Sequence, residues 1–143
     1  MKKIMFLCTF FAGLITGTAI SQDLKEKDVP ELVKSALLKK FPDAKKVSWE
    51  KEKGNFEANW GGKSGEDHSA IFTPSGDFQE LTEAISIDKL PPAIVPYVTK
   101  NYKGAKIKEA GKVTDSAGKH MFEVEIKGKD LLFDDKGVFI KED

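Results

Sequence analysis

The sequence has two histidines, and each could take part in metal binding or proton transfer. Glu66, Asp67 and His68 are consecutive and offer two carboxylates and an imidazole, which are common ligands of divalent cations. His120 flanks a second turn-rich stretch and could meet His68 across the fold. Neighbouring residues of a strand point to opposite faces, so three consecutive side chains cannot converge without a bend. We therefore expect a solvated strand entry and no metal site, and we keep His68 and His120 as metal candidates for testing.

Two further motifs resemble ligand-binding loops but lack essential residues. Gly62-Lys63-Ser64 ends like a phosphate-binding loop, yet Glu57 stands where that motif requires its first glycine. Asp134-Asp135-Lys136-Gly137 lacks the further oxygen ligands of a calcium loop and is typical of a turn. The chain has no G-x-S-x-G motif, and no set of residues supplies a nucleophile, a base and an oxyanion hole. We expect neither enzymatic activity nor a cofactor.

The charge composition argues against nucleic acid as a ligand. The full chain has 23 basic and 23 acidic residues, and every basic residue is a lysine. Proteins that bind phosphate groups commonly use the bidentate guanidinium of arginine, which this chain lacks. The single cysteine, Cys8, excludes a disulfide within the chain and a site made of several thiolates.

The segment 1–21 is expected to be a cleaved signal peptide. Lys2 and Lys3 form a positive start, residues 4–15 are mainly apolar, and residues 18–21 supply small side chains for cleavage before Gln22. The apolar run is too short to span a bilayer, which requires roughly 20 residues. Cleavage removes Cys8 and leaves a net charge of −2 with no membrane span. We expect a periplasmic or secreted protein.

Two segments, 29–41 and 90–102, show the periodicity of amphipathic helices. Apolar residues lie on one face of the first: Val29, Leu32, Val33, Ala36, Leu37 and Phe41. The second has the same spacing: Leu90, Ala93, Ile94, Tyr97, Val98 and Tyr102. We expect a capping box of Asp28 and Glu31 at the first helix. Pro96 should kink the second helix or move its start towards Ala93.

Four short strands are predicted after each helix. Those after the first helix are residues 45–53, 55–61, 67–73 and 77–84, and those after the second are 105–114, 119–127, 129–134 and 137–142. The helices and the turns that follow them recur at one constant offset in the sequence. Phe41 and Tyr102 are separated by this offset, and we call any two positions with the same separation equivalent. We interpret the chain as a tandem repeat, 22–86 and 87–143, forming one compact domain. The predicted fold is α+β, with about eight strands in one antiparallel sheet and two helices on one face.

The repeated motifs resemble those of the PepSY-like proteins, small exported proteins common in Bacteroidetes with a fold similar to the beta-lactamase inhibitor protein. The residues that carry the resemblance are Phe41-Pro42-Asp43-Ala44-Lys45, Tyr102-Lys103-Gly104-Ala105-Lys106, Phe72 to Phe78 and Phe133 to Phe139. The resemblance covers the whole chain after the leader. Lys103 replaces a proline expected from Pro42, which affects only the turn. Related PepSY domains restrain peptidases, so the resemblance implies a protein-binding role.

Strand alternation predicts an apolar surface on the sheet face away from the helices. Glu57, Asn59, Glu123 and Glu125 alternate with apolar residues and face away from the helices. The same parity turns four aliphatic residues outward: Ile71, Leu132, Val138 and Ile140. Trp49 joins them if its strand has the corresponding parity. Such a patch is typical of a protein-binding surface, although a bulge or the chain's own tail would remove it.

Three functional hypotheses follow from these features. The first is a non-enzymatic exported module that binds another exported protein, such as a peptidase, through the open sheet face. The alternative is a periplasmic protein that binds a small ligand or a metal ion through the His68 and His120 loops. The third is a hydrolase of unrecognised type. Exposed strand edges are compatible with a monomer or a weak dimer.

Overall fold

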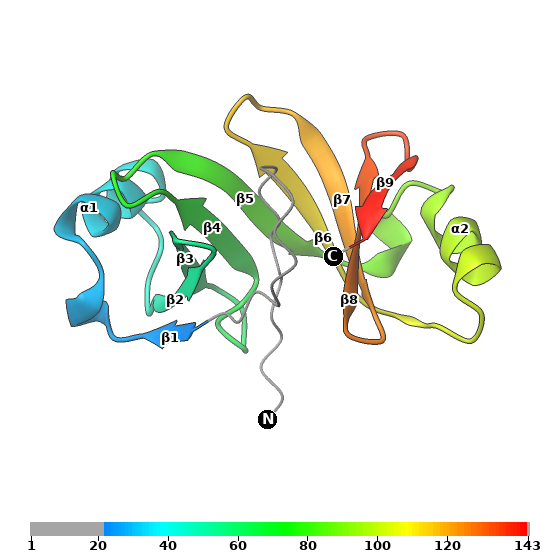
Figure 1. The fold of residues 1–143 in the computed structure, drawn as a ribbon, viewed down its shortest axis with the longest axis horizontal. Helices are drawn as coiled ribbons and strands as arrows, with labels where there is room; N and C mark the ends of the chain where they lie inside the picture. The colour runs from blue at the N-terminus through cyan, green and yellow to red at the C-terminus, as the bar shows by residue number, and fades with distance from the viewer. Residues whose placement is uncertain (1–21, 143) are drawn as a thin grey trace. The chain divides into compact units, whose positions relative to one another are not determined.

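A computed structural model describes residues 22–142, so the predicted signal peptide with Cys8 lies outside the described residues. The described residues form nine strands, two α-helices and two short 3-10 turns, and Figure 1 shows how they are arranged in each unit. The elements are β1 Gln22–Leu24, η1 Glu26–Asp28, α1 Glu31–Lys40, β2 Ser48–Glu52, β3 Asn55–Trp60, β4 His68–Phe72, β5 Phe78–Ile85, η2 Ile87–Lys89, α2 Ile94–Asn101, β6 Ile107–Asp115, β7 His120–Ile126, β8 Lys129–Asp134 and β9 Phe139–Glu142. Within residues 22–142, no helix has the length and apolar content that a membrane crossing requires.

The strands form one open antiparallel sheet in which they follow one another in chain order, from β1 to β9. This confirms the α+β class. The sheet has one strand more than the eight expected, because Gln22–Leu24 pairs with Trp49–Lys51 of β2. Two hairpins close through Lys-Gly turns in which both residues have positive φ, 49° and 86° at Lys53-Gly54 and 46° and 77° at Lys127-Gly128. Such turns match the right-handed twist of the paired strands.

The described chain divides into two compact units, residues 22–81 and 82–142. The division falls after Leu81, inside β5, whereas the predicted repeats meet at residues 86 and 87. The first unit contains α1 and strands β1 to β4, and the second contains α2 and strands β6 to β9.

Both helices are shorter at their start than the apolar periodicity predicts. Pro30 occupies the N-cap of α1 without a side-chain hydrogen bond, and Asp28 belongs to the preceding 3-10 turn. The expected capping box is therefore wrong, and Glu31 instead pairs with Lys34 at 2.8 Å. In α2, Pro96 lies in the first turn, where a missing N–H costs no helical hydrogen bond. The start of α2 is consequently at Ile94, as the position of Pro96 predicted.

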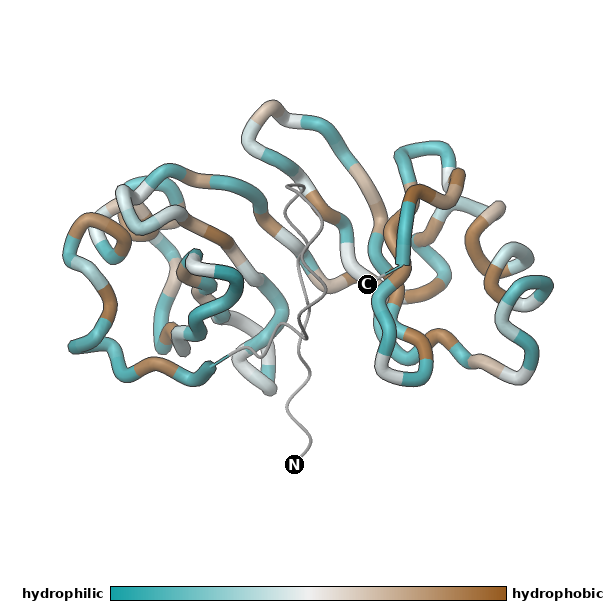
Figure 2. The backbone as a smooth tube through the Cα atoms, in the orientation of Figure 1, coloured by the Kyte–Doolittle hydropathy of each residue, from teal (hydrophilic) through white to brown (hydrophobic). Residues whose placement is uncertain are grey.

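In the first unit, α1 buries Val33 and Leu37 against one face of the strands. The strand residues in this core lie at every second position, as Phe56, Ala58 and Trp60 do on β3. Figure 2 shows hydrophobic and hydrophilic residues interspersed along the tube of this unit. The buried core comprises Val29, Val33, Leu37, Ala44, Trp49, Phe56, Ala58, Trp60, Ala70 and Phe72. Because cross-strand partners share a face, the register Trp49↔Ala58↔Ala70 places these three residues beneath α1.

In the second unit, α2 buries Ile94 and Val98 in the same manner. Its buried core comprises Leu90, Ile94, Val98, Ala110, Val124, Ile126, Leu131 and Phe133. Tyr97 of α2 stacks on Phe139 with ring centroids 5.1 Å apart and meets Phe133 edge-on at 5.4 Å. Large aromatic side chains thus connect the helix to the last two strands.

Several local hydrogen bonds recur at equivalent positions of the two segments. The N–H of Phe41 donates to the carbonyl of Leu37 at 2.7 Å, and that of Tyr102 donates to Val98 at 2.8 Å. The turn bond from Gly76 to Thr73 at 2.9 Å has its counterpart from Gly137 to Asp134 at 3.0 Å. Phe72 and Phe78 meet edge-on at 5.8 Å, as do Phe133 and Phe139. These pairs support the tandem repeat, which stays a prediction.

Gly76, in the turn between β4 and β5, is constrained both by its backbone conformation and by a close neighbouring atom. Replacing it should destabilise the protein more than replacing a turn glycine that has no close neighbour. Its φ is +86°, and an added Cβ would lie 3.0 Å from the carbonyl oxygen of Leu32 in α1. Gly54 has the same φ but no neighbour within 4 Å of its Cβ position. We expect Gly54→Ala to lower the free energy of unfolding by about 1 kcal/mol.

Gly76→Ala should lower it by about 2 kcal/mol or more, because α1 must also shift. Urea denaturation of both variants measures the difference. Equal losses would show that α1 does not approach the turn as closely as described.

Candidate functional site

In the first unit, the sheet face opposite α1 carries mainly acidic and polar side chains. Glu57 lies on β3 between Glu50 of β2 and Ile71 of β4, and these three residues are direct cross-strand partners. Asp23 of β1 continues the row beyond Glu50. Direct cross-strand neighbours share a face, so the row contains three carboxylates and one aliphatic side chain.

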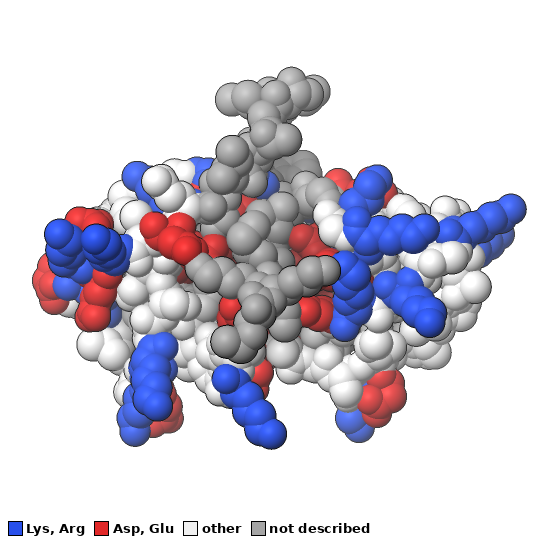
Figure 3. All heavy atoms as spheres, turned by 90° about the horizontal axis from the view of Figure 1, so that it is seen from below, with Lys and Arg blue, Asp and Glu red and all other residues white. Residues whose placement is uncertain are grey.

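In the second unit, the face opposite α2 repeats the combination of a glutamate and an aliphatic residue. Glu123 of β7 is the cross-strand partner of Leu132 on β8, which in turn is paired with Lys141 of β9. The neighbouring row consists of Glu109, Glu125 and Asp130. Figure 3 shows patches of carboxylates on the surface together with projecting lysine side chains. The open faces therefore carry aliphatic residues within rows of carboxylates.

The carboxyl group of Glu57 lies in an environment that favours its neutral form. Its side chain is 2% exposed, and Ser69 donates a 2.5 Å hydrogen bond to its Oε1. Burial raises the pKa of Glu57 to about 8, while the Ser69 hydrogen bond works in the opposite direction. The carboxylates of Glu52, Glu50 and Glu80 raise the pKa further. This face thus holds a carboxyl group that titrates near neutral pH.

Two carboxylates of the second unit, Glu125 of the acidic row and Glu142 of β9, accept hydrogen bonds from lysine side chains. Lys108 donates a 3.2 Å hydrogen bond to Glu125. At β9, Lys129 and Tyr102 both donate to the carboxylate of Glu142, the latter at 2.7 Å. The Lys129 hydrogen bond lowers the pKa of Glu142, and the bond to Glu142 raises the pKa of Tyr102 to about 12. These contacts fasten the last strand to the end of α2.

The aliphatic residues predicted to lie on the open face have different surroundings. Ile71 and Leu132 lie on that face, but Ile71 is only 3% exposed and each has a glutamate as its cross-strand partner. Val138 and Ile140 are 60% and 41% exposed, near the outer edge of the second unit. A register shift pairs Phe133 with Phe139 and Leu132 with Lys141, which leaves Ile140 as the extra residue of a bulge.

Trp49 does not belong to the open face. It is 4% exposed, lies in the core beneath α1 and is paired with Ala58, so its strand has the opposite parity. The predicted apolar patch is thus replaced by acidic rows with single aliphatic residues. Strand alternation in the sequence predicted that Glu57 and Glu123 face away from the helices. Which residues lie beside them on neighbouring strands depends on the strand register, which the sequence alone does not give.

The two histidines have separate local partners. His68 stacks on Trp60 with ring centroids 5.3 Å apart and an interplanar angle of 11°. Nδ1 of His120 lies 3.0 Å from the hydroxyl oxygen of Thr114. Among residues 22–142, no group of three or more His, Cys, Asp or Glu side chains has a geometry that could hold a metal ion.

Comparison with known protein families identifies the chain. Residues 63–141, more than half of the sequence, match the family described as beta-lactamase-inhibitor-like and PepSY-like. The protein therefore belongs to this PepSY-like family, as the repeated motifs predicted. No curated protein matches the chain.

Solved structures of Bacteroides proteins have the same fold. A protein of Bacteroides eggerthii described among "putative periplasmic proteins" is 19% identical, with a TM-score of 0.67 over 80% of this chain and 88% of the other. A DUF2874 family protein of Bacteroides uniformis is 21% identical, with a TM-score of 0.66 and the same two coverages. A BLIP-like protein of Bacteroides fragilis is 20% identical, with a TM-score of 0.58 over 80% and 84%. This fold is compatible with a periplasmic binding module.

The raised pKa of Glu57 predicts a pH-dependent contribution to stability. Between the usual value of 4.5 and about 8, the folded protein binds more protons at this site than the unfolded chain. The contribution of Glu57 to stability therefore falls as the pH rises through this range. Glu57→Gln removes the titration and keeps an acceptor for Ser69, so the variant should gain stability relative to the wild type between pH 5 and pH 8.

Urea denaturation at several pH values measures this difference. Ser69→Ala serves as a matched variant, because losing its hydrogen bond should raise the pKa of Glu57 further and extend the pH dependence to higher pH. A constant difference between Glu57→Gln and the wild type across this range would contradict the raised pKa.

Proposed function

We propose that the protein is an exported, non-enzymatic binding module that binds another exported protein through the open faces of its sheet. The observation that carries this proposal is the glutamate–aliphatic pair present on the open face of each unit, Glu57 with Ile71 and Glu123 with Leu132. The helices cover the opposite face in each unit. On the open face Glu57, Ile71 and Glu123 are at most 3% exposed, so the accessible part of these rows is formed by half-buried neighbours such as Leu132, Glu50 and Glu125.

The residue types of the two faces indicate what such a partner should contain. Carboxylates on neighbouring strands attract cationic side chains, and complementary charge mainly increases association rate and selectivity. Aliphatic residues such as Leu132 offer apolar contact within the charged rows. A partner segment with lysine or arginine side chains around an apolar anchor fits this combination. A peptidase is the class of partner that the family resemblance implies.

Export to the periplasm or beyond is part of the proposal. It is supported by the signal-like residues 1–21 and by the periplasmic description of the Bacteroides eggerthii protein. The absence of an enzymatic role is supported by the inhibitor-like description of the family and by the lack of a recognisable catalytic motif. Fold alone does not define a partner, so beta-lactamase inhibition is not inferred.

Replacing the aliphatic residues of the open sheet face with lysine should strongly weaken partner binding. We expect Ile71→Lys combined with Leu132→Lys to reduce recovery of the partner at least tenfold in affinity purification from the periplasmic fraction. The inserted ammonium groups would bring positive charge into the acidic rows and remove the apolar contacts. Because Ile71 is buried, Leu132→Lys alone is a second, milder variant for which an unchanged melting temperature is expected.

Leu38→Lys is the matched control, since Leu38 is 54% exposed on α1, away from the open face. It should leave partner recovery unchanged. Raising the salt concentration should weaken recovery by the wild type, because exposed charge pairs are screened. Equal recovery with the face variants and with Leu38→Lys would refute binding through the sheet face.

A further inference from the structure

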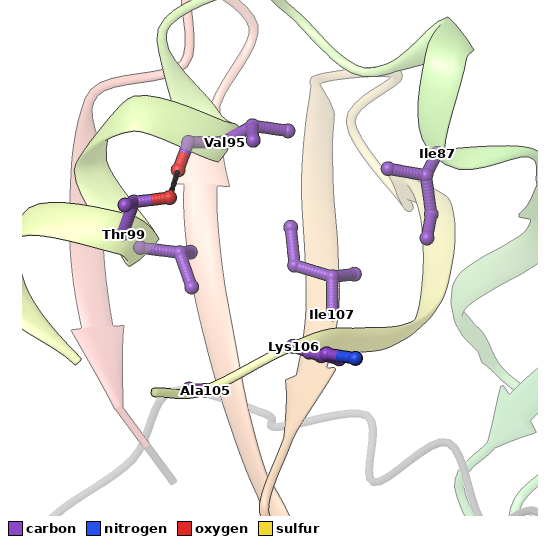
Figure 4. Close-up of a pocket in the computed structure, with 7 residues that line it drawn as sticks. Ile87, Val95, Thr99, Ala105, Lys106 and Ile107 are labelled. Atoms are coloured by element: carbon purple, nitrogen blue, oxygen red, sulfur yellow. Dashed lines mark hydrogen bonds between the residues drawn. The ribbon is translucent and has the colours of Figure 1, made fainter. Parts of the chain in front are cut away.

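A small hollow lies beside α2 in the second unit, away from the open sheet face (Figure 4). Its volume is about 220 Å³, and it is lined by Ile87, Val95, Val98, Thr99, Ala105, Lys106 and Ile107. Val98 is buried, whereas Ile87 and Val95 are 40% and 43% exposed. Pockets for drug-sized ligands usually exceed about 300 Å³, so this hollow suits a smaller apolar group.

Two lining residues of the hollow have polar side chains, Thr99 with a hydroxyl group and Lys106 with an ammonium group. The hydroxyl of Thr99 donates a 3.0 Å hydrogen bond to the carbonyl of Val95, so this hydroxyl is not a free donor for a ligand. Lys106 is exposed, and Figure 4 shows its ammonium group at the lower rim, beneath Ile107. Within residues 22–142, no carboxylate forms an ion pair with Lys106, which leaves its charge available to a ligand.

The equivalent positions of the first unit have different side chains. Those of Val95, Thr99 and Ile87 are occupied by Lys34, Leu38 and Glu26, respectively. Lys34 is paired with Glu31, and both are charged, whereas the wall of the hollow in the second unit is aliphatic. The hollow thus depends on residues in which the two segments differ, although the helix and the exit turn are shared.

We propose that this hollow binds a small monocarboxylate with an apolar tail, such as a medium-chain carboxylic acid. The tail would lie against Val95, Val98 and Ile107, and the carboxylate would face the ammonium group of Lys106. Charge complementarity selects this class over a neutral or cationic amphiphile, because Lys106 is the rim cation and the remaining lining is apolar apart from Thr99. The proposal is independent of partner binding through the sheet face.

Octanoate is the probe, and its binding to the purified protein is followed by methyl NMR shifts. We expect saturable shifts at Val95, Val98 and Ile107 with a dissociation constant on the order of 1 mM. Affinity should rise about two- to fourfold per methylene from butanoate to octanoate, as each methylene is partly buried. Octanol should bind more weakly than octanoate, and octylamine more weakly still.

Two substitutions test the two halves of the site. Lys106→Gln should weaken octanoate binding about two- to fivefold without changing octanol binding, as expected for an exposed charge pair. Thr99→Leu introduces the residue found at position 38 and should weaken both ligands about tenfold by occupying part of the hollow. Lys45→Gln, which changes the exposed lysine at the position equivalent to Lys106, is the matched control and should bind octanoate like the wild type.

Three results would overturn the proposal. One is equal binding of octanoate, octanol and octylamine, and another is an equally large shift at the exposed Leu38 methyl groups, which would indicate non-specific adsorption. The third is tighter, Lys106-dependent binding of a peptide ending in leucine, which would make the hollow a site for a protein C-terminus. Because Thr99 and Lys106 are exposed, these variants should keep the wild-type melting temperature.

Discussion

The structure depends on the burial of two aliphatic side chains of each helix against alternate residues of an antiparallel meander. Val33 and Leu37 do this in the first unit, and Ile94 and Val98 in the second. A strand that slipped by one residue would turn every core side chain to the opposite face. Helix burial therefore determines, strand by strand, which residues form the core and which form the open face.

Strand parity explains why carboxylates gather on the open faces. Asp23, Glu50 and Glu57 are consecutive cross-strand neighbours, and like charges placed directly opposite destabilise a sheet. The core does not require acidic residues at these positions, since serine or threonine would satisfy the same pattern at lower electrostatic cost. Burial is the main cause of the raised pKa of Glu57, and the neighbouring carboxylates add to it. The proposed role in recognition would account for acidic residues at positions where the fold does not require them.

The sequence predicted the features that depend on local periodicity, and it failed where long-range register decides. Helix positions and the outward direction of Ile71 and Leu132 follow from the spacing of apolar residues. The sheet face on which Trp49 lies depends on its pairing with Ala58 of β3. Strand β1 forms because its residues pair with β2, which is a long-range contact. The bulge at Ile140 and the hollow beside α2 likewise arise from tertiary contacts, for which the single sequence carries no periodic signal.

Comparison of the two segments separates two kinds of constraint. Where the segments agree, as in the exit-turn hydrogen bonds, the glycine turns and the glutamate–aliphatic pairs, the shared residues build the core or the open face. Where equivalent positions differ, as at Lys34 and Val95 or Leu38 and Thr99, the residues lie on the outer surface of a helix and contribute nothing to the core cluster. Such positions are free to change without loss of the fold. The hollow beside α2 could therefore arise in one segment alone, independently of the sheet face.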